Sequence, residues 1–407
     1  MKVAYIVKTF PVLSETFVLN QITGLLDRGV EVDVYASWRG TEDMVHPAIE
    51  SYALLERTSY SQGVRENHLG RRARLAVLFA RALARNARSP RAVWRLLRYG
   101  RKDAYRALGF VADRNGPAEY DAIHCHFGTN GDLALALRTM GVLNGPLLTT
   151  FHGYDISRYL LETSYHVYDR LFQEGDLFLP ISDYWREKLI ELGCPSEKIH
   201  VHRMGVDCEQ FSFEPRSPPS GDGVRLLSVA RLVEKKGIEY AIRAVAEFAR
   251  FRPDVEYVIL GDGPLRPELE ALVAKLEMQD RIKLLGGRPQ PEVAAHLRRA
   301  HVLLAPSVTG EDGNMEGIPV ALMEALATGI PVVSTHHSGI PELVKSGTSG
   351  LLAPERDVEA LVQCLNRLVT DADLFTRLSV AGRQLVEDEY NIEKLNDRLV
   401  ELFRSST

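Results

Sequence analysis

Short runs of apolar residues alternate along the chain with longer segments in which apolar residues recur at helical spacing. In the first half, these runs predict strands at 2–7, 30–36, 121–125, 147–151, 177–181 and 199–202. In the second half, they predict strands at 224–230, 255–260, 282–285, 301–305 and 331–334. Strands that alternate with helices indicate an α/β fold, in which parallel sheets carry helices on both faces.

A segment rich in Pro and Gly, residues 213–223, separates the two sets of strands. We therefore expect an N-terminal Rossmann-like domain over 1–212, a linker over 213–223 and a C-terminal Rossmann-like domain over 224–390, with a last helix over 391–407. A length of 407 residues is comfortable for two such domains. Ligands of such sheets bind at the carboxyl ends of the strands, which places a site in the cleft between the domains.

Two glutamates stand eight residues apart across the start of a predicted helix, at the end of strand 301–305. On a helix, eight residues rise about 12 Å and return to nearly the same face. A sugar diphosphate is about that long. Glu316 can bind hydroxyls of the sugar and Glu324 the ribose diol, with the diphosphate over the helix N-terminus. Taken alone, the two acids would more often be solvated helix residues.

Two cations occur where the strand 224–230 passes into the next helix. Arg231 offers a planar fork to phosphate oxygens and Lys236 a point charge, so the pair can neutralise a diphosphate without a metal. Without the two glutamates, both would be read as surface charges.

Several motifs together carry a family resemblance. They are Ala230-Arg231-Leu232, Lys236-Gly237, residues 261–264, Glu316 through Glu324 and residues 329–334. On these motifs the chain resembles the retaining glycosyltransferases of family 4. Residues 9–17, 126–128, 151–155 and 203–207 are similar to members of colanic acid and related exopolysaccharide biosynthesis. The resemblance extends from residue 2 to about residue 390.

The resemblance implies the GT-B fold, in which two Rossmann-like domains face each other across a cleft, and a C-terminal helix that returns to the first domain. It also implies transfer of a hexose from a nucleotide diphosphate sugar, with a uridine donor preferred, to a lipid-linked or oligosaccharide acceptor. The donor domain is the C-terminal one and the acceptor domain the N-terminal one. The nucleotide sugar is a co-substrate, and no cofactor is expected.

The resemblance also implies roles for individual residues. Glu316 binds the sugar and Glu324 the ribose. Arg231, Lys236 and the helix amides of Gly317 and Ile318 stabilise the leaving diphosphate. The segment 286–289, with Arg288, lies against the base through its backbone.

The acceptor side is expected at strand ends of the first half. His152 follows a strand and can hydrogen-bond the sugar or the charge that develops at the anomeric carbon, with Asp155 holding its orientation. Ser14 can cap a helix, with Glu15 in its first turn. Acceptor-binding candidates are therefore Ser14, Glu15, His126 and Asp155. The alternatives are a simple cap for Ser14 and structural histidines.

Composition excludes several classes of protein. A net charge of −5 argues against a general nucleic-acid binder, and four Cys without a Cys-x-x-Cys pair give no zinc motif. The only D-x-D, at 371–373, opens a C-terminal helix, so we expect activity without a divalent cation. The first residues predict a strand rather than a signal peptide, and no run approaches 18 apolar residues, so a cytoplasmic location is expected.

A basic segment stands apart from this composition. Residues 65–106 hold 13 Lys or Arg against two acidic residues, and their apolar residues recur at helical spacing. Such helices suit anionic lipid headgroups or a polyprenyl diphosphate at the inner face of the plasma membrane, or form a solvated basic face. Nucleic acid is not favoured, because no aromatic stacking platform accompanies the charge.

Two other functions suit the same architecture. A glycan phosphorylase would transfer the sugar to inorganic phosphate. A non-catalytic subunit of a polysaccharide assembly complex would bind the nucleotide sugar without turnover.

Overall fold

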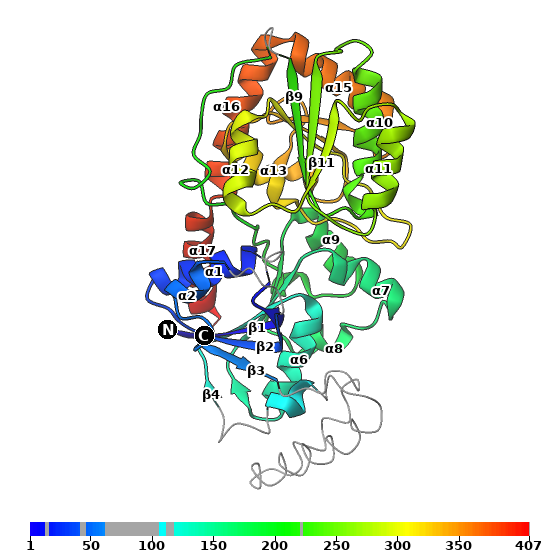
Figure 1. The fold of residues 1–407 in the computed structure, drawn as a ribbon. Coiled ribbons are helices and arrows are strands. Elements are labelled where there is room, and N and C mark those ends of the chain that lie inside the picture. Colours follow the sequence, from blue (N-terminus) through cyan, green and yellow to red (C-terminus); the bar gives the residue numbers. More distant parts are fainter. Residues whose placement is uncertain (13–15, 41–45, 62–105, 111–117, 220–222, 407) are drawn as a thin grey trace.

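Two α/β domains, one above the other in Figure 1, make up the chain. The computed structural model describes residues 1–12, 16–40, 46–61, 106–110, 118–219 and 223–406. The basic segment 65–105 and the predicted acceptor residues Ser14 and Glu15 lie outside the described residues.

The N-terminal domain is built on six parallel strands in the order β3-β2-β1-β5-β7-β8. The strands are β1 (Lys2–Phe10), β2 (Glu31–Arg39), β3 (Thr58–Tyr60), β5 (Ala122–His126), β7 (Leu147–Phe151) and β8 (Leu177–Pro180). A separate pair joins β4 (Ala118–Glu119) and β6 (Leu143–Asn144). The helices are α1 (Thr16–Asp27), α2 (Ala48–Ser51), α6 (Gly128–Thr139), α7 (Arg158–Glu162), α8 (Asp169–Glu174) and α9 (Asp183–Glu191), with short 3₁₀ turns at Tyr154–Ile156 and Ser196–Lys198.

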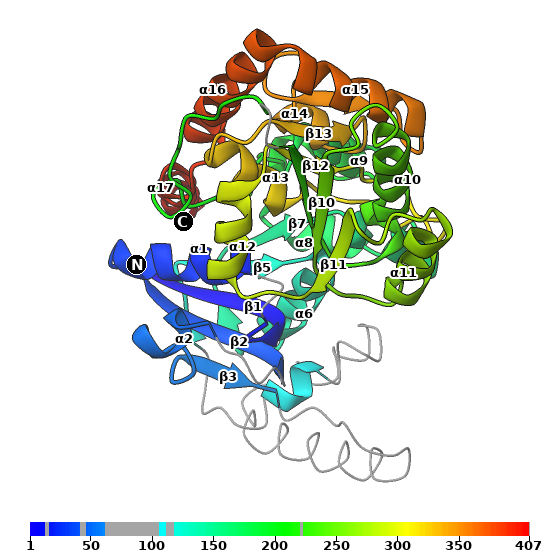
Figure 2. The same cartoon turned by 45° about the horizontal axis from the view of Figure 1, so that its top comes forward.

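The C-terminal domain repeats this architecture with the strand order β11-β10-β9-β12-β13-β14. Its strands are β9 (Val224–Val229), β10 (Val255–Leu260), β11 (Ile282–Gly286), β12 (Val302–Ala305), β13 (Val332–Thr335) and β14 (Leu351–Ala353). Its helices are η5 (Glu234–Lys236), α10 (Ile238–Phe248), α11 (Arg266–Lys275), α12 (Gln290–Arg299), α13 (Val320–Ala327), α14 (Ile340–Leu343), α15 (Val358–Thr370) and α16 (Ala372–Glu389), followed by α17 (Ile392–Ser405). Figure 2 shows α10 and α11 on one side of this sheet and α12 and α16 on the other.

Both faces of the first sheet are apolar, because strand side chains point alternately to opposite faces. In β1, Val3 and Tyr5 belong to the buried cluster that includes α1 and α17, whereas Ala4 and Ile6 belong to the cluster that includes α6. A continuous apolar run therefore became a strand buried on both sides, as the sequence predicts for a parallel sheet.

The predicted parallel sheets are confirmed, with two kinds of error in the strands. Residues 199–202 lie beside β8, where the N–H groups of His200 and His202 donate to the carbonyls of Phe178 and Pro180, but the segment forms only an isolated bridge at Ile199 and not the predicted strand. Strands β3 and β14, each of three residues at a sheet edge, were not predicted. A three-residue strand is too short for a period to be read from its sequence.

The last helix, α17, leaves the C-terminal domain and packs on the N-terminal one (Figure 1). Phe403 and Leu399, both 0% exposed, belong to the same buried cluster as Val3 and Tyr5 of β1. Arg28 in the turn after α1 forms ion pairs with Glu393 and Asp397 of α17. The helix thereby completes the core of the first domain from the opposite end of the sequence.

A carboxylate from the C-terminal domain caps a helix of the N-terminal domain. Both oxygens of Glu342 in α14 accept backbone N–H bonds at the start of α9, from Asp183 (3.0 Å) and Tyr184 (2.9 Å). Arg203 contacts the same carboxylate at 3.2 Å. Negative charge is favoured at a helix N-terminus, so this contact holds the two domains together beside the cleft.

Within the described residues, every helix is too short or too polar to cross a membrane.

We predict that Phe403→Ala destabilises the N-terminal domain by about 3–5 kcal/mol, because it leaves a large cavity beneath β1. All three Trp, at positions 38, 94 and 185, precede the linker in the sequence, so urea unfolding followed by Trp fluorescence reports on the N-terminal half of the chain. The exposed neighbour Glu401→Ala should leave the unfolding midpoint unchanged. Equal midpoints for the two variants would contradict the proposed packing.

Candidate active site

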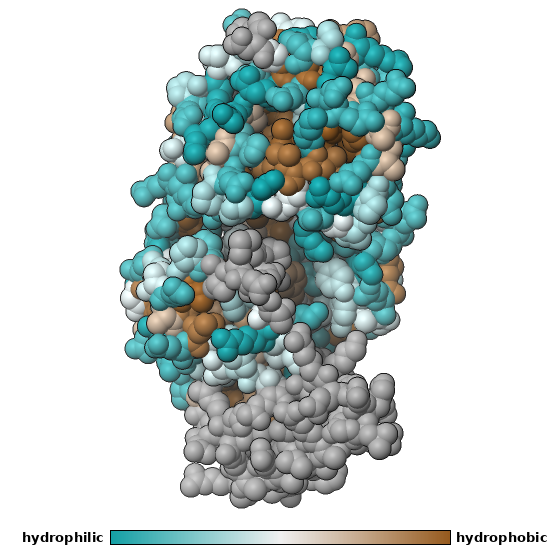
Figure 3. Space-filling model, in the orientation of Figure 1, coloured by the Kyte–Doolittle hydropathy of each residue, from teal (hydrophilic) through white to brown (hydrophobic). Residues whose placement is uncertain are grey.

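A cleft of about 640 Å³ lies between the carboxyl ends of the two sheets, within the usual size of a small-molecule site. Figure 3 shows that this side of the molecule is largely hydrophilic, with apolar residues gathered in a hollow of the C-terminal domain. The cleft walls come from both domains. They include Thr16, Phe17, Phe127, His152, Tyr154, Ile181 and Met204 on one side, and Arg231, Lys235, Lys236, Gly287, Arg288, Glu316, Gly317, Ile318, Val320, Ala321 and Glu324 on the other.

Glu316 is a buried, charged carboxylate in this cleft, with a residue exposure of 6%. Its two oxygens lie 2.9 Å from Nζ of Lys235 and 2.6 Å from Nζ of Lys236. Burial acts to raise the pKa of Glu316, but the charges of Lys236 and Lys235 outweigh it and lower the pKa to about 2. Glu316 is therefore ionised at every physiological pH.

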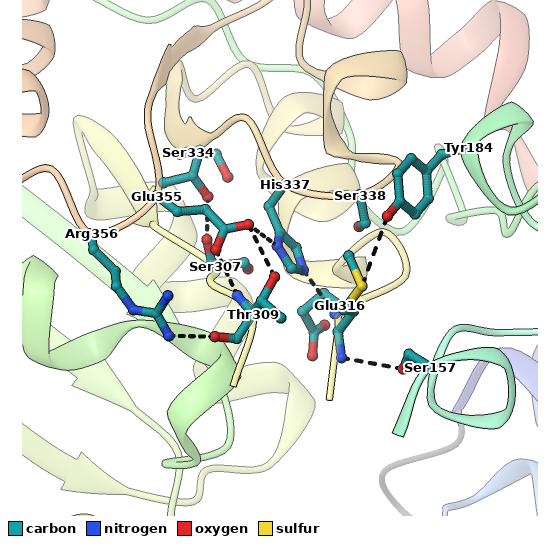
Figure 4. Close-up of polar contacts among 12 residues, drawn as sticks. Ser157, Tyr184, Ser307, Thr309, Glu316, Ser334, His337, Ser338, Glu355 and Arg356 are labelled. Atoms are coloured by element: carbon teal, nitrogen blue, oxygen red, sulfur yellow. Dashed lines mark hydrogen bonds and ion pairs between the residues drawn. The ribbon is translucent and has the colours of Figure 1, made fainter. Parts of the chain in front are cut away.

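Residues behind Glu316 fix its backbone, as Figure 4 shows. The Glu316 N–H donates to Nε2 of His337 (2.9 Å), and Nδ1 of His337 lies 2.5 Å from Glu355. Because Nε2 accepts, the proton of the neutral ring is on Nδ1 and is donated to the carboxylate. Glu355 also accepts the N–H of Thr309 at 2.7 Å. The loop that carries Glu316 is thus anchored to two other segments of the domain.

The eight-residue spacing of the glutamates is not entirely helical. Helix α13 begins at Val320 with Pro319 as its N-cap, so Glu316, Gly317 and Ile318 lie in the loop before it. The expectation that the amides of Gly317 and Ile318 belong to the helix is therefore wrong, because Pro319 ends the loop and starts the helix. The first helical amides, those of Val320 and Ala321, belong to residues that line the cleft.

Arg231 and Lys236 come to the cleft from the loop after β9. Gly237 follows with a φ of 62°, and a Cβ there would lie 1.8 Å from the carbonyl oxygen of Pro306. Only glycine fits this turn, which aims the two lysines at Glu316. Arg231 has no ion pair with the described residues, so its guanidinium is available to a ligand.

Glu324 differs from Glu316 in its surroundings. It lies on α13, lines the cleft and has no side-chain hydrogen bond to any described residue. Burial without a cation raises its pKa to about 7. A carboxylate in this state gains by accepting hydroxyl hydrogens from a ligand.

Of the predicted acceptor-side residues, His126 and Asp155 both contact His152. His152 itself lines the cleft, with its ring centroid 4.9 Å from Phe17 and 4.5 Å from Phe127. His126 is 1% exposed, and its Nδ1 lies 2.9 Å from Nε2 of His152. His126 therefore lies beneath the cleft wall, where it supports His152 and is not open to an acceptor.

Asp155 is also below the surface, at 0% exposure. Its carboxylate accepts backbone N–H bonds from Gly128 (2.9 Å), His152 (3.0 Å) and Gly153 (3.0 Å). Burial raises its pKa to about 6 although these amides stabilise the charge. This geometry favours a positioning role for Asp155 over acceptor binding.

Two site residues were missed by the sequence reasoning. Lys235 pairs with Glu316 beside Lys236. Its place next to Lys236 in the same turn was the sequence signal that could have identified it. His337 holds the Glu316 backbone from 21 residues away, a partnership that no local pattern shows. Arg288, which was predicted, lines the cleft and lies 3.6 Å from Glu292.

The two domains touch inside the site. A Cβ on Gly317 would lie 2.5 Å from the carbonyl oxygen of His152 and 2.5 Å from Cδ1 of Ile181. Glycine at this position lets the loop that carries Glu316 approach His152 and Ile181 of the N-terminal domain. Among the described residues, no group of three or more His, Cys, Asp or Glu is arranged to hold a metal ion.

Comparison with known proteins identifies the family of the chain. Residues 14–210 match the family model described as Glycosyltransferase Family 4, and residues 210–385 match the model described as Glycosyl transferases group 1. WcaL of Salmonella typhimurium, a glycosyltransferase named for colanic acid biosynthesis, is 42% identical over 411 residues that span all of both chains. The chain belongs to glycosyltransferase family 4.

Other relatives of this family 4 glycosyltransferase differ in their named substrates. The amylovoran biosynthesis glycosyltransferase AmsK of Erwinia amylovora is 42% identical over 96% of each chain. A GDP-mannose-dependent alpha-(1-6)-phosphatidylinositol monomannoside mannosyltransferase of Mycolicibacterium smegmatis is 28% identical over 70% of this chain and 77% of its own.

Solved structures confirm the GT-B fold. HepE of Anabaena, in complex with UDP and glucose, aligns over all of both chains with a TM-score of 0.71 at 18% identity. A sucrose-phosphate synthase of Thermosynechococcus elongatus aligns over 100% of this chain and 98% of its own with a TM-score of 0.72 at 19% identity.

Replacing Glu324 should separate binding from stability. At pH 8, Glu324→Gln should weaken binding of the nucleotide sugar about 10- to 100-fold, through loss of charge-assisted hydrogen bonds. The same change should stabilise the protein by at most about 3 kcal/mol, because a carboxyl with a raised pKa is ionised at a cost in the folded state. Calorimetric titration and urea unfolding measure the two effects.

The pH dependence follows from the same shift. Below about pH 4.5 the carboxyl is protonated in both folded and unfolded states, and the stability cost is absent. The cost grows as pH rises to about 7 and is constant above. Donor affinity of the unmodified protein should rise with pH through about 7. The exposed Glu359→Gln variant should retain that rise, and a rise retained by Glu324→Gln would contradict the assignment.

Gly317→Ala should slow glycosyl transfer at least about tenfold, because its Cβ would push the donor loop away from His152 and misplace the reacting groups. Donor affinity should change little, because the donor-binding side chains stay on one domain. Steady-state kinetics beside calorimetry check this, and an unchanged transfer rate would disprove the need for close approach.

Proposed function

We propose that this glycosyltransferase moves a hexosyl group from a UDP-sugar to a hydroxyl of a lipid-linked or oligosaccharide acceptor in exopolysaccharide biosynthesis, with retention of the anomeric configuration. The observation that carries the proposal is that one cleft holds both a cationic turn and a carboxylate with no partner among the described residues. Glu324 offers an acceptor for two hydroxyls, and Arg231 and Lys236 offer charge for a diphosphate.

The donor fits the cleft in one direction. Glu324 takes the ribose diol, Glu316 takes hydroxyls of the sugar, and the diphosphate lies at the N-terminus of α13 beside Arg231 and Lys236. The base lies against Gly287 and Arg288 at the end of β11. This order places the anomeric carbon toward His152 of the other domain.

In the proposed reaction, the acceptor oxygen forms a bond to the anomeric carbon, and the bond from that carbon to the diphosphate oxygen breaks. Both events occur on the same face of the sugar, and the acceptor proton passes to the leaving diphosphate. Arg231 and Lys236 stabilise the charge that develops on the diphosphate. The products are the glycosylated acceptor and UDP.

The names of similar proteins support the donor and the pathway. HepE has been solved with UDP and with UDP-glucose, and WcaL and AmsK are named for colanic acid and amylovoran biosynthesis. The mycobacterial relative is named for GDP-mannose, so a guanosine donor is the competing choice. Among hexoses, galactose is the preferred expectation.

The proposal includes the conditions of the reaction. The nucleotide sugar serves as co-substrate without a resident cofactor, and the lysines and Arg231 replace a divalent cation. The enzyme works in the cytoplasm, with peripheral contact to the inner face of the plasma membrane through the basic segment 65–106. Residues 65–105 of that segment lie outside the described part of the chain.

A panel of uridine and guanosine diphosphate sugars, offered with lipid-linked oligosaccharide, tests the function. Release of UDP and an NMR coupling that shows the donor's anomeric configuration in the product are expected. Turnover of a sugar 1-phosphate without nucleotide would indicate a phosphorylase instead. Binding of a donor without turnover on any acceptor would indicate a non-catalytic subunit.

We predict that transfer continues undiminished in excess EDTA, because fixed cations carry the charge of the diphosphate. Lys236→Met should lower kcat at least about 100-fold, and added Mg²⁺ should restore little of it. Initial rates with and without chelator decide this. Activity that disappears with EDTA and returns with Mg²⁺ would disprove the metal-independent mechanism.

A further inference from the structure

A chain of hydrogen bonds runs from the core of the N-terminal domain to His152 on the cleft wall. The amide oxygen Oε1 of Gln21, on α1, lies 2.8 Å from the hydroxyl of Tyr5 and 2.9 Å from Nε2 of His126. Nδ1 of His126 lies 2.9 Å from Nε2 of His152. Four side chains from α1, β1, β5 and the end of β7 are therefore in series.

Tyr5 determines which group donates and which accepts in this series of hydrogen bonds. Its side chain is 0% exposed, and Gln21 is its only hydrogen-bond partner among the described residues. A buried hydroxyl that fails to donate costs about 1–3 kcal/mol, so Tyr5 must give its hydrogen to Gln21. Burial raises the pKa of Tyr5 well above its usual value, which keeps that hydrogen in place. The amide oxygen of Gln21, and not its nitrogen, consequently faces Tyr5.

The Gln21 oxygen in turn determines which nitrogen of His126 and of His152 carries the hydrogen. An amide oxygen carries no hydrogen, so Nε2–H of His126 must donate to it. A neutral imidazole has one N–H, so Nδ1 of His126 accepts, and Nε2–H of His152 donates to it. Burial lowers the pKa of both histidines, that of His152 to about 3, so neither ring carries a second proton. The lone pair on Nδ1 of His152 is left over.

That lone pair has no partner among the described residues, and His152 lines the cleft. Phe17 and Phe127 pack against the ring and restrict its rotation. We propose that Gln21 is a positioning residue, which acts with Tyr5 through His126 to fix the tautomer of His152, so that Nδ1 accepts a hydroxyl hydrogen from the bound sugar. The inference rests on the proposed glycosyl transfer.

The fixed tautomer restricts the substrate. His152 can receive a hydrogen at Nδ1 but cannot give one there. A sugar whose hydroxyl at this position is replaced by a methoxy group loses the bond and meets a repulsive lone pair, as does a sugar with fluorine there. His152 also cannot serve as the acid that protonates the leaving diphosphate.

NMR of the ring nitrogens tests the tautomer without any substrate. In protein labelled with ¹⁵N-histidine, His152 of the wild type should show the Nε2–H tautomer, with its signals assigned by their loss in His152→Asn. In Gln21→Met, which removes the acceptor at similar volume, His152 should show a mixture of both tautomers. Asn20→Met, on the same helix, should leave the wild-type pattern.

Kinetics of the same variants provide a second readout. Gln21→Met should lower kcat about tenfold while the donor KM changes less than about threefold, since orientation at the reacting centre is lost and the donor contacts remain. Asn20→Met should match the wild type. A merely structural role for Gln21 would lower the unfolding midpoint and leave the tautomer and the ratio of kcat to KM unchanged.

Gln21→Glu gives a distinct signature. A carboxylate accepts from Tyr5 and His126 as the amide oxygen does, so activity at high pH should be close to the wild type. As pH falls, the new negative charge favours protonation of His126, both of whose nitrogens then donate, and His152 must take the opposite tautomer. The titratable groups that face His126 are Tyr5, His124 and His152, with His202 nearby.

Activity of Gln21→Glu should therefore fall toward low pH more steeply than that of the wild type. The proposal is overturned if folded Gln21→Met keeps a single Nε2–H tautomer at His152 and the wild-type kcat. If Gln21→Met does not fold, an unchanged tautomer of His152 at low pH in Gln21→Glu overturns it instead. If the wild type transfers no sugar, the proposed function fails while the NMR result still decides the tautomer.

Discussion

The burial of one negative charge governs the architecture of the cleft. Glu316 is almost inaccessible to water, a position that an isolated carboxylate would occupy only as the neutral acid. Lys235 and Lys236 from the turn after β9 offset this cost, and His337 fixes the backbone of Glu316 from the segment after β13. The site therefore exists only when three separate segments of the C-terminal domain are folded together.

The same constraint organises the region around it. The loop that carries Glu316 continues through Gly317, which approaches the carbonyl of His152 across the cleft. Ser157 of the N-terminal domain receives the N–H of Met315 at 3.4 Å, and Arg158 pairs with Asp312 at 2.5 Å (Figure 4 shows the Ser157 contact). The anchored loop thus contacts the N-terminal domain, beside the cap that Glu342 places on α9.

Two glutamates of one motif have opposite electrostatic states in this cleft. The pKa of Glu316 is lowered to about 2 because two cations outweigh its burial, and the pKa of Glu324 is raised to about 7 because no cation faces it. One carboxylate is already paired before a ligand arrives and the other is not. Glu316 with its lysines is accordingly a preorganised element, whereas the Glu324 carboxylate has no hydrogen-bond partner among the described residues and, in the proposed function, receives its partners from the ligand.

Much of the fold, and the charged residues that line the cleft on the C-terminal domain, could be predicted from local sequence, whereas the surroundings of His126 and Asp155 could not. The two sheets, the cationic turn at Arg231 and Lys236, and the spaced glutamates depend on periods and turns within about ten residues. The roles of His126 and Asp155 depend on whether a strand-end side chain points into the cleft or beneath it, and both proved to lie beneath.

The sequence by itself determined the alternation of strands and helices and the residue types available at the strand ends, because period, turn chemistry and charge are properties of neighbouring residues. Only the tertiary structure decided which charges pair, which histidine nitrogen holds its proton, and which side chains of α17 enter the core of the first domain, to which the family resemblance already implied that the last helix returns. These depend on burial and on partners brought together from distant segments. The pKa of a carboxylate or an imidazole departs from its ordinary value only when packing removes water from the group or sets another charged or polar group beside it.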